Sequence, residues 1–199
     1  MHIARRTLTS ALLAVTLLSG AGVGSAAAAG PKPVPKVELD RYLGTWHQLA
    51  AVPAPFNLVC ARDTKAEYSL AGNGEVRVKN SCTTWAGTPN TITGRAKVLD
   101  RVTGAQLRVR FPGVPNWGES ETVPNYIVVG LDQDYSWAVV TDPGRRSGFV
   151  LSRTPALDRS QWKSVRAAIA RAGQSDCTYL TSPTTGGLSE IVPLCTRVR

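Results

Sequence analysis

The sequence has few of the side chains on which hydrolytic and metal-dependent catalysis usually depends. Only two histidines occur in 199 residues, and one of them, His2, lies in the N-terminal segment. A Ser–His–acid or Cys–His mechanism would therefore have to use His47. There is also no H-E-x-x-H pair, no glycine-rich phosphate loop and no calcium-loop pattern. We therefore expect no catalytic residues, no metal and no cofactor.

One acidic pair leaves an alternative open. Asp132 and Asp134 flank a predicted turn, and two neighbouring carboxylates can form a catalytic or ion-binding pair. Acidic residues in turns usually accept hydrogen bonds from their own backbone. The pair is the only acidic site that the sequence leaves as a candidate.

The chain also lacks an apolar run long enough to cross a bilayer. Arg5 and Arg6 precede an apolar stretch, Ala11 to Leu18, and small residues follow through Ala29. A membrane span needs about 20 residues, so this pattern predicts a secretory signal peptide over residues 1–29. No cysteine follows the apolar stretch where a bacterial lipoprotein would carry its anchor. We expect a secreted, extracellular protein without a lipid anchor, exported by the Sec or the twin-arginine route.

The rest of the chain fits one domain. Residues 30–36 (Gly-Pro-Lys-Pro-Val-Pro-Lys) cannot sustain a helix or a central strand and are predicted to form an extended leader. Residues 37–199 have the length of one domain. The formal net charge is +9, but Lys and Arg are spread mostly singly along the chain. We therefore expect a monomer with no nucleic-acid partner and, at most, a transient contact with an anionic membrane surface.

All four cysteines lie after the predicted signal peptide. An even number of cysteines in an exported chain indicates two disulfides. The spacing favours the pairs Cys60–Cys82 and Cys177–Cys195, although three connectivities are possible. Zinc is the competing interpretation, but the chain has no C-x-x-C pair.

Strand signals dominate residues 45–153. Leu107, Val109 and Phe111 alternate with polar residues, which is typical of a strand with one buried and one solvated face. Short turns containing Gly, Asn, Asp and Pro separate the runs. Eight antiparallel strands in sequence predict an all-β up-and-down barrel or a sandwich. The expected strands cover 45–52, 64–70, 75–80, 91–99, 105–111, 126–131, 137–140 and 148–153.

One helix interrupts this pattern near the C-terminus. Residues 158–172 place Trp162, Val165 and Ile169 on one face, with Asp158 as the N-cap and Gly173 after the last turn. We expect this helix to pack on the wall of the barrel. Residues 177–183 are candidates for a ninth short strand.

Three blocks of sequence carry a family resemblance. Gly44-Thr45-Trp46 resembles the G-x-W signature on the first strand of lipocalins, and Gln133-Asp134-Tyr135 resembles the turn of their second block. Leu151-Ser152-Arg153-Thr154-Pro155 is similar to the third block, whose Arg packs on the Trp. The resemblance covers about residues 37–183 and is strongest to the bacterial lipocalin and apolipoprotein D branch. Two positions depart from it: His47 stands where an aromatic is common, and Gln133 stands where Thr is usual.

The resemblance implies an eight-stranded barrel with a calyx for one small ligand. Fatty acids and lysophospholipids are the class favoured for that branch, and an isoprenoid is a further possibility. Gly44, Trp46 and Arg153 would latch the closed end. The alternation predicts an inward-facing lining of Gln48, Ala50, Ala66, Tyr68, Val76, Val78, Ile92, Ala96, Leu107, Val109, Phe111, Tyr126, Val128, Val140 and Phe149. Links 53–63 and 112–124 would form the open rim, with contacts to the ligand from Phe56, Leu58, Arg62, Lys65 and Trp117.

Two other functions remain open on the same fold. An enzyme acting on a bound lipid would need titratable groups inside the barrel, where the inward phase offers mainly Gln48, Tyr68 and Tyr126. A protein-binding or inhibitor module would instead use the rim loops and leave the barrel empty.

Overall fold

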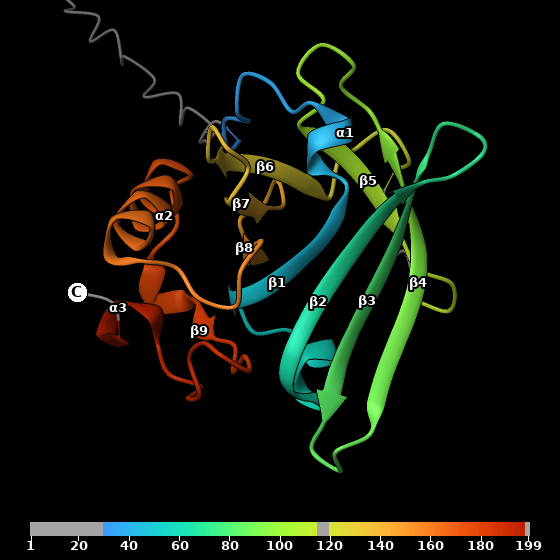
Figure 1. Ribbon diagram of the computed structural model, residues 1–199. Helices are drawn as coiled ribbons and strands as arrows, with labels where there is room; N and C mark the ends of the chain where they lie inside the picture. Colours follow the sequence, from blue (N-terminus) through green and yellow to red (C-terminus); the bar gives the residue numbers. More distant parts are fainter. Residues whose placement is uncertain (1–29, 115–119, 198–199) are drawn as a thin grey trace, which may run out of the picture.

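The computed structural model describes residues 30–114 and 120–197. The predicted signal peptide and the predicted rim residue Trp117 lie outside the described residues. Eight strands follow one another along the chain (Figure 1). They are β1 (Gly44–Ala51), β2 (Cys60–Leu70), β3 (Val76–Thr84), β4 (Pro89–Val98), β5 (Gln106–Arg110), β6 (Tyr126–Leu131), β7 (Trp137–Thr141) and β8 (Gly148–Ser152).

These strands form a closed antiparallel barrel in up-and-down order. Each strand from β2 to β8 pairs with its neighbour in sequence, and β1 closes the circle by pairing with both β8 and β2. The predicted all-β barrel is confirmed, and the sandwich alternative is excluded. A short helix, α1 (Leu39–Tyr42), precedes β1, and a 3-10 helix, η1 (Pro55–Val59), fills the link from β1 to β2.

The leader lies against the barrel. The backbone N–H of Val34 donates to the carbonyl of Val128, and that of Val37 donates to Thr103. Val34 can make such a bond although it lies between two prolines, which have no N–H. These two hydrogen bonds attach the end of the leader and the first residue after it to the barrel.

A bulge in β1 reverses the direction of its last side chains. Gln48 pairs with Leu151, but the next pair in register is Ala50 with Val150. Because the register shifts between them, Ala50 joins the apolar cluster on the outer wall, which also contains Val150. The prediction that Ala50 lines the interior is wrong. Ala51, which pairs with Phe149, takes the inward position instead.

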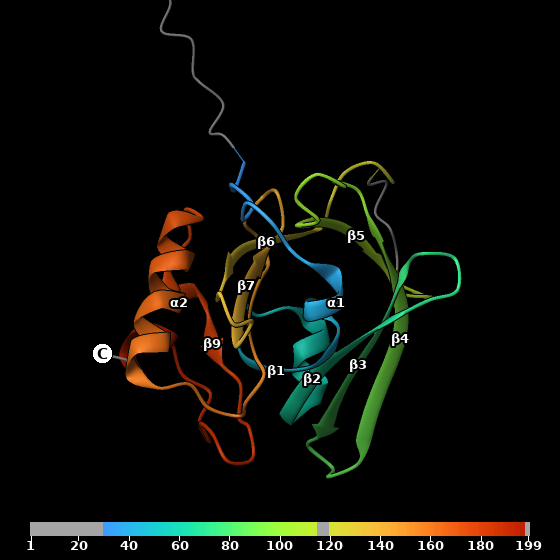
Figure 2. The ribbon, with the colours of Figure 1, turned by 45° about the horizontal axis from the view of Figure 1, so that its top comes forward.

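The predicted helix is present as α2 (Arg159–Arg171) and packs on the outer wall (Figure 2). A carboxylate oxygen of Asp158 accepts from the backbone N–H of Gln161 at 2.8 Å, which completes a capping box. The buried face of the helix includes Trp162, Val165 and Ile169 and shares its apolar cluster with residues of β6 and β7. This cluster forms a second core outside the barrel.

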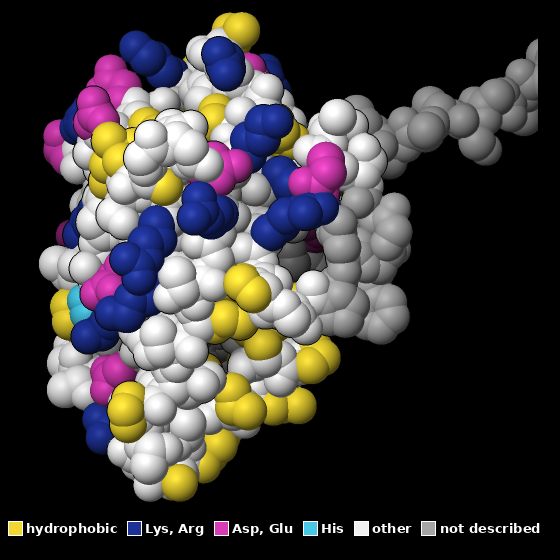
Figure 3. Space-filling view, turned by 90° about the vertical axis from the view of Figure 1, so that its right-hand side faces the viewer, with side chains coloured by type: hydrophobic (Ala, Val, Ile, Leu, Met, Phe, Trp, Pro, Cys, Tyr) yellow, Lys and Arg dark blue, Asp and Glu magenta, His cyan; other side chains and the backbone are white. Residues whose placement is uncertain are grey.

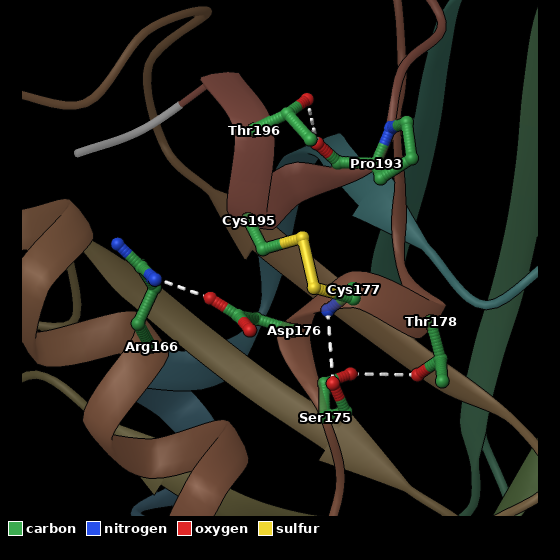
Figure 4. Close-up of a disulfide and its surroundings, with 8 residues drawn as sticks. All are labelled: Arg166, Ser175, Asp176, Cys177, Thr178, Pro193, Cys195 and Thr196. Carbon is green, nitrogen blue, oxygen red and sulfur yellow. Dashed lines mark hydrogen bonds and ion pairs between the residues drawn. A yellow bond between two sulfur atoms is a disulfide. The ribbon is translucent and has the colours of Figure 1, made fainter.

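The C-terminal segment closes over the same wall. It contains η2 (Asp176–Thr178), the short strand β9 (Leu180–Thr181) beside β1, and α3 (Leu194–Arg197). A disulfide joins Cys177 to Cys195, and an ion pair joins Asp176 to Arg166 of α2 (Figure 4). The predicted ninth strand is thus present but short.

Both disulfides join the pairs that the spacing favours, Cys60–Cys82 and Cys177–Cys195. Within the described residues, the one grouping of possible metal ligands is Asp176, Cys177 and Cys195. Its two sulfur atoms are bonded to each other, so neither is a thiolate that could bind zinc. No helix within residues 30–114 and 120–197 has the length and apolar character required to cross a membrane.

Candidate functional site

One end of the barrel is closed by a tryptophan and an arginine from opposite ends of the strand series. The guanidinium carbon of Arg153 lies 3.8 Å from the centre of the Trp46 ring. Its nitrogens donate to the carbonyls of Thr45 at 2.9 Å and Arg41 at 2.6 Å. Gly44 has φ +92°, and a Cβ there would lie 3.3 Å from an Arg153 nitrogen. Glycine at this position therefore allows both the backbone turn and the close approach of the arginine.

Three buried tyrosines form a chain of hydroxyl groups beneath this closed end. The Tyr126 hydroxyl lies 2.9 Å from that of Tyr42 and 3.0 Å from that of Tyr68. Burial raises the pKa of Tyr68 to about 12, and the pKa values of Tyr42 and Tyr126 are also raised, mainly by burial. The three groups are therefore neutral near pH 7. The alternation had indicated Tyr68 and Tyr126, but Tyr42 precedes the first strand and was missed.

Most of the predicted lining does face the interior. One buried cluster gathers nine of these side chains, and Val109, Phe111 and Phe149 pack against it partly buried. The nine are Ala66, Tyr68, Val76, Val78, Ala96, Leu107, Tyr126, Val128 and Val140. Gln48 is buried and donates to the Ser182 hydroxyl at 2.9 Å. The lining side chains of the described strands carry no formal charge.

The opposite end of the barrel exposes apolar side chains. Ile92 lies on the inward phase of β4, opposite Asn80, yet it is 38% exposed. Phe56 of η1 is 60% exposed, and its ring centre lies 6.4 Å from that of Phe149. Trp85, in the turn between β3 and β4, is 69% exposed and donates from its indole nitrogen to the carbonyl of Leu58. Phe56, Leu58, Trp85 and Ile92 are called the mouth residues below.

Trp85 is the mouth residue that sequence reasoning missed. It lies between two predicted strands in a Thr-Trp-Ala-Gly turn, where a large aromatic has no buried face to explain it. That mismatch is the signal that could have identified it. The Cys60–Cys82 disulfide lies beside η1 and the turn between β3 and β4. Cys60 directly follows η1, and Cys82 lies near the end of β3, shortly before Trp85.

Arg62 and Lys65 do not belong to a rim loop. Strand β2 already begins at Cys60, so both residues are part of it. Lys65 pairs with His47 and follows the outward phase, next to the inward Ala66. Arg62 donates to the Asp63 carboxylate and to the Thr185 hydroxyl of the C-terminal segment. Their predicted contact with a ligand head group is therefore not supported. Arg62 belongs to β2 because the strand starts earlier than expected, and Lys65, which was expected within the strand, lies on its outward phase.

His47, the one histidine of the predicted domain, lies on the outer wall. It pairs with Lys65 on one side and Ser152 on the other. Burial, and then the charge of Lys65, lower the pKa of its imidazole. His47 is thus a neutral base near pH 7 that does not face the barrel interior, where an enzyme acting on a bound lipid would need it.

The acidic pair in the turn between β6 and β7 has a structural role. The Asp132 carboxylate accepts from the hydroxyl of Ser136 at 2.7 Å and from the backbone N–H groups of Asp134 and Ser136 at 3.3 Å. The carbonyl of Gln133 accepts from Arg41 at 2.9 Å. Asp132 therefore organises this turn, as turn acids commonly do.

The described residues also line hollows at the surface of the barrel wall. One, of about 260 Å³, is an apolar crevice where the start of α2 and the C-terminal segment meet β1, lined by residues such as Leu49 and Trp162. The other, of about 700 Å³, lies along β3, β4 and β5, and its lining combines seven charged side chains with apolar ones that include Val109 and Phe111. The link after β5 contributes Pro112, Val114 and Glu121 to the second hollow. These three residues of the link thus line the hollow along β3, β4 and β5.

Comparison with known proteins gives a consistent result. A family model described as a lipocalin-like domain matches residues 37–183. The chain is 33% identical over 130 residues to the outer membrane lipoprotein Blc of Vibrio cholerae, covering 64% of this chain and 71% of that protein. It is 31% identical over 154 residues to apolipoprotein D of Bos taurus, covering 73% and 78% of the two. Insecticyanin from the tobacco hornworm Manduca sexta has a similar fold, with a TM-score of 0.57 at 16% identity over 82% of this chain and 93% of that one.

Proposed function

The chain belongs to the lipocalin family, and from this premise we propose that it binds and carries one small hydrophobic or amphipathic molecule inside the barrel. Members of the family are generally binding proteins. The ligand class that we propose is a fatty acid or a lysophospholipid, with an isoprenoid as a further possibility. We expect the molecule to be held and released unchanged, without a cofactor or metal.

The observation that carries this proposal is the polarity of the lining. The inward-facing side chains extend from the neutral tyrosine hydroxyls at the closed end to exposed Ile92 at the mouth. All of them are apolar or uncharged. Such a lining favours an apolar chain, at roughly 25 cal/mol for each Å² removed from water. A charged head group would find no opposite charge among the described lining residues. We therefore propose that the head group remains at the mouth.

The first test identifies the molecule that the protein carries. The exported, oxidised protein would be examined by native mass spectrometry, and the bound material would be extracted and identified. A stoichiometric fatty acid, lysophospholipid or isoprenoid would support the proposal. A barrel that is empty and also fails to bind added lipids would contradict it.

A matched pair of variants tests where the ligand binds. Ile92 lies on the inward phase of β4 and Thr91 on the outward phase, and both are exposed. Ile92→Glu places a carboxylate inside the mouth, so we expect the Kd for a fatty acid to rise at least about tenfold, because a charge would be buried beside an apolar chain. Thr91→Glu adds the same charge outside and should leave Kd unchanged. Equal Kd values for the two variants would exclude binding through the mouth.

The exposed mouth residues favour one alternative. Three large apolar side chains, those of Phe56, Leu58 and Trp85, are exposed around one opening, which is a common property of protein-binding surfaces. A rim-loop binding module would capture a partner protein without saturable lipid binding. Tryptophan fluorescence during a fatty-acid titration separates the two functions, because only a carrier gives a saturable change.

Secretion is part of the proposal. Two disulfides are typical of proteins that mature in an oxidising compartment. Blc of Vibrio cholerae is an outer membrane lipoprotein by name, whereas we propose an unanchored extracellular monomer. Sequencing the N-terminus of the exported protein and measuring its mass test this directly. Cleavage near residue 29 without an added lipid mass is expected, and an acylated product would contradict it.

A further inference from the structure

Basic side chains that are dispersed in the sequence gather on one outer face of the barrel. Arg77 of β3 pairs directly with Arg95 of β4, and Arg95 pairs directly with Arg110 of β5. In the next row, Lys97 of β4 faces Arg108 of β5. Figure 3 faces this side of the molecule and shows Lys and Arg side chains in a band across it. We call Arg77, Arg95 and Arg110 the arginine row.

Such a row is not the usual arrangement of a solvated sheet. Like charges directly opposite one another on neighbouring strands destabilise the pairing, whereas opposite charges stabilise it. The same sheet shows the usual arrangement nearby, where Lys79 of β3 faces Glu67 of β2 and their charged atoms lie 2.8 Å apart. The arginine row therefore concentrates positive charge where a neutral or mixed pair would be more stable.

The row also borders the hollow of about 700 Å³. The charged residues lining it are five basic ones, Arg77, Arg95, Lys97, Arg108 and Arg110, and two acidic ones, Glu75 and Glu121. The lining thus has an excess of positive charge. Arg108 is only 3% exposed although it lies on the outward phase, so its guanidinium is held in the wall of the hollow.

The two carboxylates act as local counterions. Glu75 lies 3.6 Å from Arg95, and Glu121 pairs with Arg110 and lies 3.9 Å from the Arg108 Nε. The contacts of Glu75 with Arg95 and of Glu121 with Arg110 are at the surface, where ion pairs are weak and exchange with solvent. An incoming anion with more charge than a carboxylate could replace them without opening the fold.

We propose that this face binds phosphate groups, with the arginine row as the main contact. Guanidinium groups donate in a fixed fork that matches the oxygens of a phosphate. Neighbouring strands lie about 4.8 Å apart, so the row offers a series of forks about 10 Å long. The phosphate could belong to an anionic lipid surface or to a soluble phosphorylated compound. The arginine row lies on the outward phase of the sheet, opposite to the barrel lining, and the proposal does not depend on the carrier function.

Two probes distinguish these sources. Vesicles of phosphatidylcholine containing phosphatidylglycerol present phosphate on a surface, and pyrophosphate presents it in solution. Binding to the vesicles by co-sedimentation, with little competition from pyrophosphate, would assign the site to a lipid surface. A pyrophosphate-induced rise in Tm above that of sodium chloride at matched ionic strength, without vesicle binding, would assign it to a soluble compound. Failure of both probes, or equal binding to pure phosphatidylcholine vesicles, would overturn the proposal.

A matched pair of charge-removing variants tests the location. Arg77→Gln/Arg95→Gln removes two charges from the row, and Lys163→Gln/Arg171→Gln removes two exposed charges from α2, which lies on the opposite side of the barrel (Figure 2). Two basic residues near an anionic surface are worth about 30-fold in affinity. We expect a loss of that size for the first variant and a change of less than about threefold for the second, because salt screens distant charges. Equal losses would mean that only net charge matters.

Folding and independence are controlled in the same experiment. The first variant removes a facing like-charge pair, so its Tm should not fall. If it does fall, Arg110→Gln serves as the second variant, with an expected loss of about fivefold, and unchanged binding in that variant would overturn the proposal. Ile92→Glu, which tests the barrel interior, should bind the phosphate probe as well as the unmodified protein does. The two proposals can therefore fail separately.

Discussion

The guanidinium of Arg153 stacks on the indole of Trp46. Trp46 lies in β1, the first strand of the barrel, and Arg153 directly follows β8, the last one. The stacking combines a cation–π contact with two hydrogen bonds to backbone carbonyls. Because β1 also pairs with β8 along a strand ladder, this contact reinforces the closure of the barrel at one end.

Replacing Arg153 should destabilise the protein without affecting the mouth. Arg153→Ala removes the stacking and leaves two carbonyls without their donors, so we expect a loss of about 2 kcal/mol in the free energy of unfolding. Arg153→Lys keeps the charge but not the fork and should lose nearly as much. Urea denaturation measures both. An unchanged midpoint in Arg153→Ala would show that the pair is incidental to closure.

The tyrosine chain predicts a loss of stability at alkaline pH. An unfolded tyrosine has a pKa near 10, and burial raises the pKa of folded Tyr68 to about 12 and raises those of Tyr42 and Tyr126 too. A raised pKa means that the folded protein holds its protons more tightly, so the contribution is complete below about pH 10 and declines above it. Urea midpoints between about pH 9 and pH 11 should fall, and the fall should be shallower in Tyr68→Phe. A pH-independent midpoint would contradict the burial of these hydroxyls.

The bulge in β1 predicts opposite effects for two alanines. Ala50 is fully buried on the outer wall, and Ala66 faces the interior. Ala50→Leu should overpack the wall and cost about 1–3 kcal/mol while leaving the Kd for a fatty acid unchanged. Ala66→Leu should weaken binding instead, because it narrows the proposed ligand site. Reversed effects would mean that β1 continues in the simple alternating phase.

The two disulfides should act on different parts of the fold. Their loops have similar lengths, with separations of 22 and 18 residues, so removing either should cost about 3 kcal/mol. Hydrogen exchange should quicken around residues 53–59 and 85–88 in Cys60→Ser/Cys82→Ser. In Cys177→Ser/Cys195→Ser it should quicken around 174–197. A uniform increase over all strands in either variant would contradict local stapling.

Local alternation of apolar and polar residues predicts most of this fold. It fails where the position of a side chain depends on the register between two strands. It identified the strands and most of the inward side chains, because period-two burial is visible within each segment. The helix was identified from its own apolar face. The position of Ala50 depends on how β1 and β8 come into register, which no local pattern contains. The early start of β2 likewise places Arg62 on the wall, where the sequence predicted a loop.

The arginine row illustrates the same limit in the distribution of charge. Arg77, Arg95 and Arg110 are far apart in sequence, each between apolar neighbours, and such spacing reads as dispersed charge. The register of three strands places them side by side. A charge cluster on a sheet is a property of pairing, so only a model of the register could have predicted it.

The pairing of β1 with both β2 and β8 also determines the order in which strands can pair while the chain folds. A chain that emerges with its N-terminus first can form the hairpins from β1 to β7 one after another, but the second edge of β1 has no partner until residues 148–152 appear. Until then the nascent sheet carries two open edges, and open edges invite pairing with other chains. Closing the barrel joins residues that are far apart along the chain: Thr45 and Arg153, which share a hydrogen bond, are separated by 108 positions. Contacts of such long range form slowly. The protein is therefore most prone to aggregate in the interval before β8 pairs with β1 and closes the barrel.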